Sequence, residues 1–200
     1  MTADLVVSNA QIVTPSSTFA GHIYVTGGRI SAITSEKEAG AAREIDAEGR
    51  FVLPGMVDEH VHMMDPGFTD REDWTTGTMA AARGGITTVV DHHRSEPLVY
   101  TRKILEEKTE YINSRAVVDF GQLGGIDLDN LEHLKPMWDG GALGFKGFIC
   151  ELHGVPDLSE GVLLNVMREV KTFGGTVMLH CESDSILKKA KAQIDADGRT

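Results

Sequence analysis

Two histidines separated by one residue, His60 and His62, are the residues with the clearest chemical potential in this sequence. They end a short run, residues 54–62, whose apolar part is typical of a strand. Side chains alternate between the two faces of a strand, so both imidazoles should project to the same side and can hold one metal ion there. A surface strand that happens to carry two histidines is the alternative. The strand-and-polar-end pattern that repeats farther along the chain argues against it.

Lys146 lies inside an apolar run, residues 144–149, where a charged ammonium group would be costly to bury. Burial lowers the pKa of a lysine and favours the neutral amine. Such an amine can react with carbon dioxide to form a carbamate, whose two oxygens can bridge two metal ions. The alternative is a lysine whose methylene stem carries the charge out to solvent.

Two more polar residues follow apolar runs. His180 follows residues 176–179, and Asp91 follows the run that begins at Ile86. In parallel βα folds the carboxyl ends of the strands share one face, where the functional residues gather. We therefore expect His180 to join the histidine pair at one site, and Asp91 can orient a metal-binding histidine from behind.

Arg94 and the preceding pair His92-His93 allow two interpretations. Arg94 could bind an anionic group of a substrate or lie on the surface, and the two histidines have the same ambiguity. Met63 and Met64 suggest a less polar pocket wall, although methionine more often serves packing.

The elements that must position these residues repeat at a regular interval. An interval of roughly 30 residues is the length of one βα unit, and successive units form a parallel sheet or barrel. We therefore predict an α/β fold, a partial (β/α)8 TIM barrel with about five βα units, although a complete barrel normally needs about 250 residues. Its strands should begin near Met56, Ile86, Ala116, Leu143 and Thr176.

The helices between these strands have recognisable ends. A capping box at residues 69–72 predicts the start of the first helix, and Gly84-Gly85 its end. Pro97 should open the second, Pro136 should cut a third around 130–134, and residues 157–160 should cap a fourth that Gly174-Gly175 close. A last helix should begin near Asp184.

Residues 1–54 predict a small β-rich module, a β-sandwich, that precedes residues 55–200 as the first part of the barrel. Gly27-Gly28 is a hairpin signal between two apolar runs, while residues 39–42 are typical of a loop. His22 should lie on the surface of this module. The expected strands are 5–7, 11–13, 22–25, 29–33 and 50–53.

Composition narrows the classes of partner. The chain is 41% hydrophobic and 24% charged, as in an ordinary globular protein, and its net charge of −11 disfavours nucleic acid and anionic membranes. The first residues lack the pattern of a secretory signal, so a cytoplasmic location is the default expectation. Cys150 and Cys181 form no metal-binding spacing and are expected to be reduced, buried thiols.

Several motifs together resemble the cyclic amidohydrolases of the amidohydrolase superfamily, the group that holds dihydropyrimidinase or hydantoinase, allantoinase and dihydroorotase. Each motif alone is weak, and the combination is highly specific. The resemblance runs through nearly all of the chain. The motifs are His60-x-His62, Asp65-Pro66-Gly67, Thr76-Gly77-Thr78, Ala80-Ala81-Ala82, Gly84-Gly85-Ile86-Thr87-Thr88, Gly144-Phe145-Lys146 and His180-Cys181-Glu182.

The resemblance implies a (β/α)8 barrel with two divalent metal ions, usually zinc, and a homo-oligomer. On that pattern His60 and His62 bind one metal, a carboxylated Lys146 bridges both, and His180 binds the second. The family also requires a histidine after strand six and an aspartate after strand eight that moves the protons. Neither region is present before Thr200. The implied reaction is hydrolytic opening of a small cyclic amide or ureide by a water that bridges the metals.

The subfamily stays open. Dihydroorotases of this type have an arginine, and allantoinases usually an asparagine, where this chain has Met64. Hydantoinases commonly have a tyrosine at the position of Glu151, while the turn at residues 65–67 is closer to allantoinases and dihydroorotases. A hypothesis of another class is a noncatalytic fragment or assembly subunit, since five strands would leave a sheet edge exposed.

Overall fold

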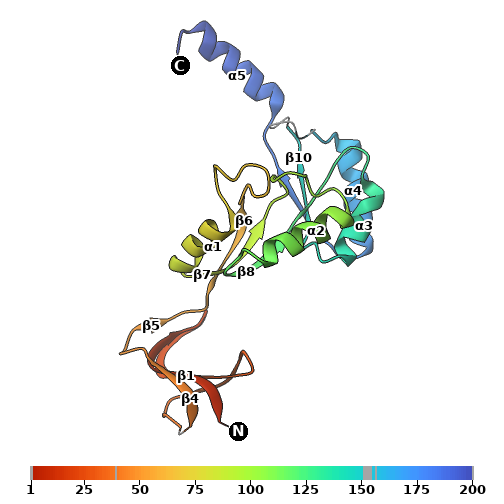
Figure 1. Ribbon diagram of the computed structural model, residues 1–200. Coiled ribbons are helices and arrows are strands. Elements are labelled where there is room, and N and C mark those ends of the chain that lie inside the picture. The colour runs from red at the N-terminus through yellow and green to blue at the C-terminus, as the bar shows by residue number, and fades with distance from the viewer. Residues whose placement is uncertain (1, 39, 151–154, 156, 200) are drawn as a thin grey trace. The chain divides into compact units, whose positions relative to one another are not determined.

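The computed structural model describes residues 2–38, 40–150, 155 and 157–199. It divides the chain into two compact units, Met1–Gly55 and Met56–Thr200 (Figure 1). Each unit has its own sheets and its own apolar clusters, and each is described here by itself.

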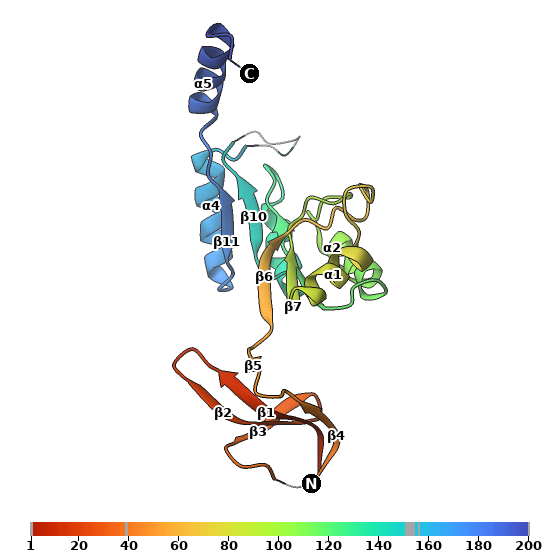
Figure 2. The ribbon, with the colours of Figure 1, turned by 90° about the vertical axis from the view of Figure 1, so that its left-hand side faces the viewer.

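The first unit is one five-stranded sheet built around its longest strand (Figure 2). The strand order is β3-β2-β1-β4, and β5 also pairs with β1. The pairs β1–β2 and β2–β3 are antiparallel, while β4 and β5 run parallel to β1. The β-sandwich of the sequence analysis stays a prediction. The strands are β1 (Ala3–Val13), β2 (Thr18–Thr26), β3 (Arg29–Thr34), β4 (Ala41–Asp46) and β5 (Phe51–Val52).

Two details of this sheet differ from the sequence prediction. The expected strands 5–7 and 11–13 form one strand, which is interrupted only by a bulge near Asn9, where φ is +52°. The expected loop at 39–42 is wrong at its second half, because Ala41 already pairs with Ala3 at the start of β4. The hairpin is confirmed: Gly27 and Gly28 have φ of +58° and +74°, the left-handed values that a tight two-residue turn requires.

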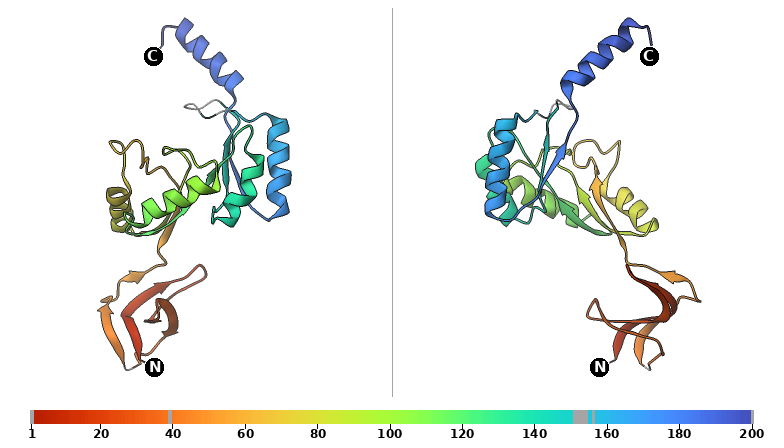
Figure 3. Two further views of the ribbon diagram at one scale, coloured as in Figure 1. Left: turned by 45° about the vertical axis from the view of Figure 1, so that its right-hand side comes forward. Right: turned by 180° about the vertical axis from the view of Figure 1, so that it is seen from behind.

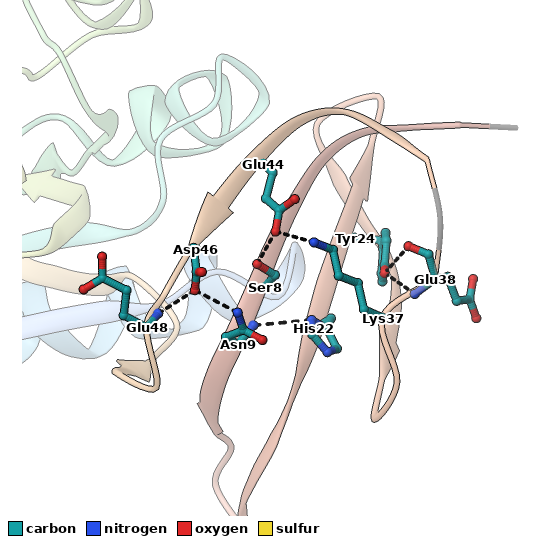
Figure 4. Close-up of polar contacts among 9 residues, drawn as sticks. All are labelled: Ser8, Asn9, His22, Tyr24, Lys37, Glu38, Glu44, Asp46 and Glu48. Atoms are coloured by element: carbon teal, nitrogen blue, oxygen red, sulfur yellow. Dashed lines mark hydrogen bonds and ion pairs between the residues drawn. The ribbon is translucent and has the colours of Figure 1, made fainter.

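His22 corrects another expectation, since it is buried in this sheet and not on its surface. Its Nδ1 accepts a hydrogen bond from the backbone N–H of Asn9, at 3.3 Å, in the bulge of β1 (Figure 4). A bulge takes a backbone donor out of the regular ladder, and the ring satisfies that donor. In the same view Glu44 accepts hydrogen bonds from Ser8 and from Lys37. The hydrogen bond from Lys37 is the main cause that lowers the pKa of Glu44.

The second unit contains two three-stranded sheets, in the orders β6-β7-β8 and β9-β10-β11, and every pair in them is parallel. A backbone hydrogen bond connects the two sheets, from the N–H of Leu143, just before β10, to the carbonyl of Gln122 in β8. The parallel βα pattern agrees with the prediction, while its completion to an eight-stranded barrel stays a prediction. The strands are β6 (Met56–Val61), β7 (Ile86–Asp91), β8 (Asp119–Gln122), β9 (Gly124–Gly125), β10 (Phe145–Phe148) and β11 (Val177–His180).

The helices alternate with these strands, and α2, α3 and α4 lie beside one another (Figure 3). Four of the predicted ends are confirmed. The Ser159 hydroxyl caps α4 by accepting from the N–H of Val162, and α4 ends just before Gly174-Gly175. Gly84 is the C-cap of α1, and α5 begins at Asp184. Among the described residues no helix combines the length and apolar character needed to cross a bilayer. The helices are α1 (Trp74–Arg83), α2 (Arg102–Asn113), α3 (Leu131–Asp139), α4 (Glu160–Thr172) and α5 (Asp184–Ala196).

Three predicted helix boundaries are wrong. The first helix is capped by the Asp73 carboxylate, which accepts from the N–H of Thr76, and not by the box at residues 69–72. The second helix begins after Thr101 and not at Pro97. Pro136 lies inside α3, where it removes only the bond to the carbonyl of Glu132, an exposed first-turn residue whose carbonyl can bond water.

Apolar side chains between helices and strands fix the strand ends that carry polar residues. Trp74 of α1, Val89 of β7 and Ile112 of α2 belong to one cluster, in which Trp74 is fully buried. A larger cluster lies under β10 and includes Phe145 together with Met137 of α3. Packing of this kind holds backbone positions closely, because protein interiors are as dense as organic crystals.

Candidate metal centre

The polar residues that the sequence analysis predicted to be functional lie at or near the carboxyl ends of the parallel strands. Parallel pairing places the end of β6 beside β7, with Val61 opposite Asp91, and the end of β10 beside β11, with Phe148 opposite His180. These ends surround a cavity of about 540 Å³ within the second unit. All six residues that the sequence analysis assigned to metal or substrate binding line it. The lining residues are His60, His62, Met64, Arg71, Glu72, Arg94, Lys146, Phe148 and His180.

His60 and His62 lie close together, as their spacing predicts. Their ring centroids are 5.3 Å apart, and the ring planes are inclined by 68°. A third ring, His92, lies 3.8 Å from His60 and 5.4 Å from His62. Each of the three histidines offers a nitrogen, and these nitrogens lie within 4.8 Å of one another, so the cluster has the donor chemistry of a metal site.

His92 is the residue of this cluster that sequence reasoning missed, because a histidine pair after a strand is as compatible with the surface as with the interior. Both His92 and His93 are buried, with exposed fractions of 1%. Nε2 of His92 lies 3.2 Å from the carbonyl oxygen of Glu59, and its Nδ1 has no hydrogen-bond partner among the described residues. Since a carbonyl only accepts, Nε2 carries the proton and Nδ1 keeps a free lone pair.

The histidines of the cluster are held in the neutral form that binds metals. Partial burial of the ring, with a smaller contribution from the neighbouring His60, lowers the pKa of His62 to about 4. Burial and His60 also lower the pKa of His92 to about 4, and burial lowers that of His60. Neutral imidazoles at neutral pH present lone pairs to a cation without first losing a proton.

Lys146 lies in the interior with an exposed fraction of 5%, on the strand β10 and on the cavity wall. Its Nζ is 5.3 Å from the ring centroid of Phe148. Burial lowers the pKa of this amine. Within the described ranges no carboxylate forms an ion pair with it, so the lysine is a buried base without a counter-ion from those residues.

His180 ends β11, and its Nε2 lies 3.4 Å from Oε2 of Glu182. That nitrogen is shielded from solvent and makes no hydrogen bond within the described part of the chain. Cys150 and Cys181 are both free thiols. The expectation of a buried thiol is confirmed for Cys150 and wrong for Cys181, which follows the strand end and is exposed.

Asp91 acts on the backbone near the histidines and not on a ring. Its Oδ1 accepts a hydrogen bond of 3.0 Å from the N–H of Met63, the residue after His62. Burial raises the pKa of Asp91 to about 7. The contact holds the chain where it leaves β6, and the expected contact with a histidine ring is replaced by this backbone contact.

The segment that follows β6 also lines the cavity. Met64 is buried on the cavity wall with φ of +57°, whereas Met63 packs into the apolar cluster around Trp74. Arg94 reaches the cavity, as one of its two interpretations required, and Arg71 joins it there. Sequence reasoning missed Arg71 because it assigned residues 69–72 to a helix cap. Glu151 lies outside the described residues.

The donor set fits a site for divalent metal ions. Neutral imidazoles converge from His60 and His62, His180 presents an unpaired nitrogen, and Lys146 is a buried amine without a described carboxylate partner. Imidazole nitrogens in this arrangement suit zinc and similar borderline ions. Buried polar atoms normally have a partner, and a bound metal ion would provide the partner that the unpaired nitrogen of His180 lacks.

Comparison with known proteins gives a consistent result. The model of the amidohydrolase family matches residues 51–200. The allantoinase of Deinococcus radiodurans is 34% identical over 203 residues, which cover 100% of this chain and 45% of that protein. The dihydroorotase of Methanosarcina acetivorans is 31% identical over 196 residues, which cover 97% of this chain and 42% of that protein.

Among solved structures, the L-hydantoinase (dihydropyrimidinase) from Arthrobacter aurescens superposes with a TM-score of 0.94 at 33% sequence identity. The match covers 98% of this chain and 44% of that one. The chain therefore spans less than half the length of each of these proteins. The matched residues include every strand end that lines the cavity. Because the family model, the related sequences and the solved structures agree, the chain belongs to the amidohydrolase family.

Proposed function

We propose that this chain supplies the metal-binding half of a hydrolase that opens a small cyclic amide or ureide. Family membership and relatives named allantoinase, dihydroorotase and L-hydantoinase support this class of reaction. One observation carries the proposal furthest. The buried amine of Lys146 lies on the same cavity wall as three imidazoles and lacks a described carboxylate partner.

In this proposal His60 and His62 hold one divalent ion, His180 holds a second, and a carboxylated Lys146 contacts both. Zinc is the first candidate because the donors are nitrogen and oxygen. Two such ions would supply a water of lowered pKa and would polarise the ring carbonyl of the substrate. The residue that moves protons to the leaving nitrogen is not among the assigned residues of this chain.

The chemistry at Lys146 follows from its burial. Its neutral Nζ adds to the carbon of carbon dioxide, one N–C bond forms, and one proton leaves to solvent. The product is a carbamate, an anion, so the modification replaces a poorly solvated cation by a ligand that metal ions stabilise. The bicarbonate and carbon dioxide dissolved in ordinary buffer provide the reactant.

Arg94 and Arg71 give the cavity wall two cations, which suit a substrate with a carboxylate or an electron-rich ureide oxygen. Met64 occupies an adjacent part of the wall and adds an apolar surface. These features are compatible with a hydantoin, a dihydropyrimidine or allantoin. The carboxylate of a dihydroorotate-like substrate would find a cationic partner in Arg94 or Arg71 and not at the position of Met64. A homo-oligomer and a cytoplasmic location belong to the same proposal.

A second candidate function is that of an assembly subunit or fragment without activity of its own. Met56 and Val57 of the edge strand β6 are 56% and 62% exposed, which is unusual for apolar residues of a parallel strand. Sedimentation of this product distinguishes the two functions when it is combined with a ring-opening assay. A monomer that opens hydantoin, dihydrouracil, allantoin or dihydroorotate would eliminate the fragment hypothesis.

The carbamate provides the direct test of the leading proposal. The chain is loaded with zinc in the presence of 13C-bicarbonate, and the carbamate carbon is observed by NMR. We expect one carbamate signal that Lys146→Ala abolishes and a parallel loss of about one bound ion. Lys108→Met is the matched control, because Lys108 is also buried and has a lowered pKa but donates to Ser95. A signal that survives in Lys146→Ala, or that Lys108→Met removes, would show that the assignment is wrong.

A further inference from the structure

A second group of ligand-type side chains lies beside the candidate centre and is not explained by it. Cys150, His180 and Glu182 each offer one ligand atom, a sulfur, a nitrogen and an oxygen, and the three atoms lie within 4.8 Å of one another. Only His180 among them has a place in the proposed hydrolytic site. The cluster therefore needs a separate explanation.

The pairing of β10 with β11 brings the three residues together. Phe148 lies opposite His180 in the parallel register, and the N–H of Ile149 donates to the carbonyl of His180 at 3.1 Å. Cys150 and Glu182 each lie two residues beyond this pair of strand ends, and their ligand atoms are within 4.8 Å of each other. The convergence is thus set by strand register and by backbone hydrogen bonds, which are stiffer than surface side chains.

Two of the three ligand atoms are shielded from solvent. The Cys150 side chain is buried, with an exposed fraction of 1%, and this burial raises the pKa of its thiol, while the backbone N–H of Glu182 acts in the opposite direction. Nε2 of His180 is shielded and unbonded, although Oε2 of Glu182 is only 3.4 Å away. A nitrogen and a carboxylate oxygen at this distance without a hydrogen bond between them leave two lone pairs that one cation can satisfy.

We propose that Cys150, His180 and Glu182 form a binding site for a single thiophilic divalent cation. A thiolate, an imidazole and a carboxylate are a donor set that zinc, cobalt(II) and cadmium accept in tetrahedral geometry, with a water as fourth ligand. Binding displaces the thiol proton to solvent, so the metal–sulfur bond forms as one proton is released. Hard ions such as magnesium would not occupy it.

This site shares His180 with the proposed hydrolytic centre. One histidine nitrogen cannot serve two ions, so occupation of the thiol site withdraws His180 from the ion that Lys146 would contact. The cluster itself does not depend on the hydrolytic activity. A failure of one proposal therefore leaves the other standing.

Cobalt(II) is the probe, since a cobalt–thiolate bond produces an intense charge-transfer absorption in the near ultraviolet that nitrogen and oxygen ligands do not give. The whole reduced chain carrying Cys181→Ser is titrated first. The sequence has two cysteines, so any such band in this variant comes from Cys150 alone. We expect a band that saturates with one equivalent of cobalt in this variant and in the unmodified chain. Absence of the band in Cys181→Ser overturns the proposal.

Four further variants test the ligands and separate the two sites. Cys150→Ser should lose the band completely, and a band that persists there contradicts the proposal. Glu182→Gln should weaken cobalt affinity about tenfold, the size of effect that loss of one metal-supporting group produces. Glu72→Gln is its matched control, because Glu72 lines the cavity without belonging to the cluster, and an equal loss in both variants would exclude Glu182 as a ligand. Lys146→Ala should keep the band while it loses the carbamate signal, which separates this site from the hydrolytic centre.

Discussion

The imidazole ring of His92 lies flat against that of His60, with centroids 3.8 Å apart and planes inclined by 4°. An imidazole binds a metal along a lone pair in its own plane. Two parallel stacked planes share no point, so these two rings cannot both direct a lone pair at the same ion in this arrangement. The structure therefore gives His92 a positioning role, in which its face fixes the orientation of His60.

Substitution of His92 tests this role. His92→Phe keeps a flat ring against His60, whereas His92→Ala removes it, and both lose the contact with the Glu59 carbonyl. We expect zinc affinity, measured by competition with a chelator, to fall about tenfold in His92→Ala and to change little in His92→Phe. His133→Ala controls for nonspecific loss of a histidine, since His133 is on α3 and does not line the cavity. Equal losses in both His92 variants would show that stacking on His60 is not what His92 contributes to zinc binding.

The difference between His62 and His92 illustrates what the sequence can predict. The pair His60-x-His62 follows from the alternation of side chains along one strand, which is a local property. The position of His92 depends on the register of β6 against β7, where Val61 lies opposite Asp91, and local patterns do not specify such a register. Five of the six parallel strands were predictable for the same reason as His62, because their apolar runs and spacing are local signals, whereas the two-residue β9 has no such run.

Other differences arise where two local signals compete. Residues 69–72 have the composition of a capping box, but Asp73 offers a stronger N-cap and Trp74 is fully buried, so the helix begins one turn later. The displaced segment then joins the cavity wall through Arg71. Burial of Trp74 is a tertiary effect, and tertiary packing commonly overrides local propensity.

Asp65 ties this wall segment to two helices, and its removal should loosen the wall. Its Oδ1 accepts from the Tyr111 hydroxyl at 2.6 Å, its Oδ2 from the N–H of Trp74, and its carbonyl from Trp74 Nε1 at 2.8 Å. We expect Tyr111→Phe to lower the free energy of unfolding in urea by about 1–2 kcal/mol and Asp65→Ala by about 3 kcal/mol, because buried partners lose their bonds. Ser114→Ala, at the exposed end of the same helix, should change it by less than about 0.5 kcal/mol. Identical effects of Tyr111→Phe and Ser114→Ala would show that the network contributes nothing.

Lys108 should make stability depend on alkaline pH. Burial lowers its pKa from 10.5 to about 8, while its Nζ donates to the carbonyl and hydroxyl of Ser95 at 2.7 Å each. Between these two pKa values the unfolded chain binds more protons than the folded one, so the contribution of Lys108 to stability is present above pH 10.5 and is lost as the pH falls through 8.

The measurement compares unfolding free energies of two variants across this pH window. Relative to Lys108→Met, the unmodified chain should gain stability as the pH rises, with a slope of at most about 1.4 kcal/mol per pH unit. Lys103→Met, which removes an exposed lysine from the same helix, is the control for the loss of one positive charge. A flat difference between the unmodified chain and Lys108→Met would show that Lys108 titrates as it does in water.

The two ends of α4 should respond oppositely to the same substitution. Gly161 lies in the first turn with ordinary helical backbone, and Gly174 follows the last turn with φ of +71°; a methyl group at either position meets no atom within 4 Å. Steric contacts are therefore absent, and only backbone preference remains. Gly161→Ala should raise the free energy of unfolding by about 0.5 kcal/mol, because alanine loses less entropy in a helix. Gly174→Ala should lower it by about 1 kcal/mol, since left-handed backbone is unfavourable for any residue with a Cβ. Urea unfolding of the two variants measures both signs, and a shared sign would mean that packing beyond the helix, and not backbone preference, controls these positions.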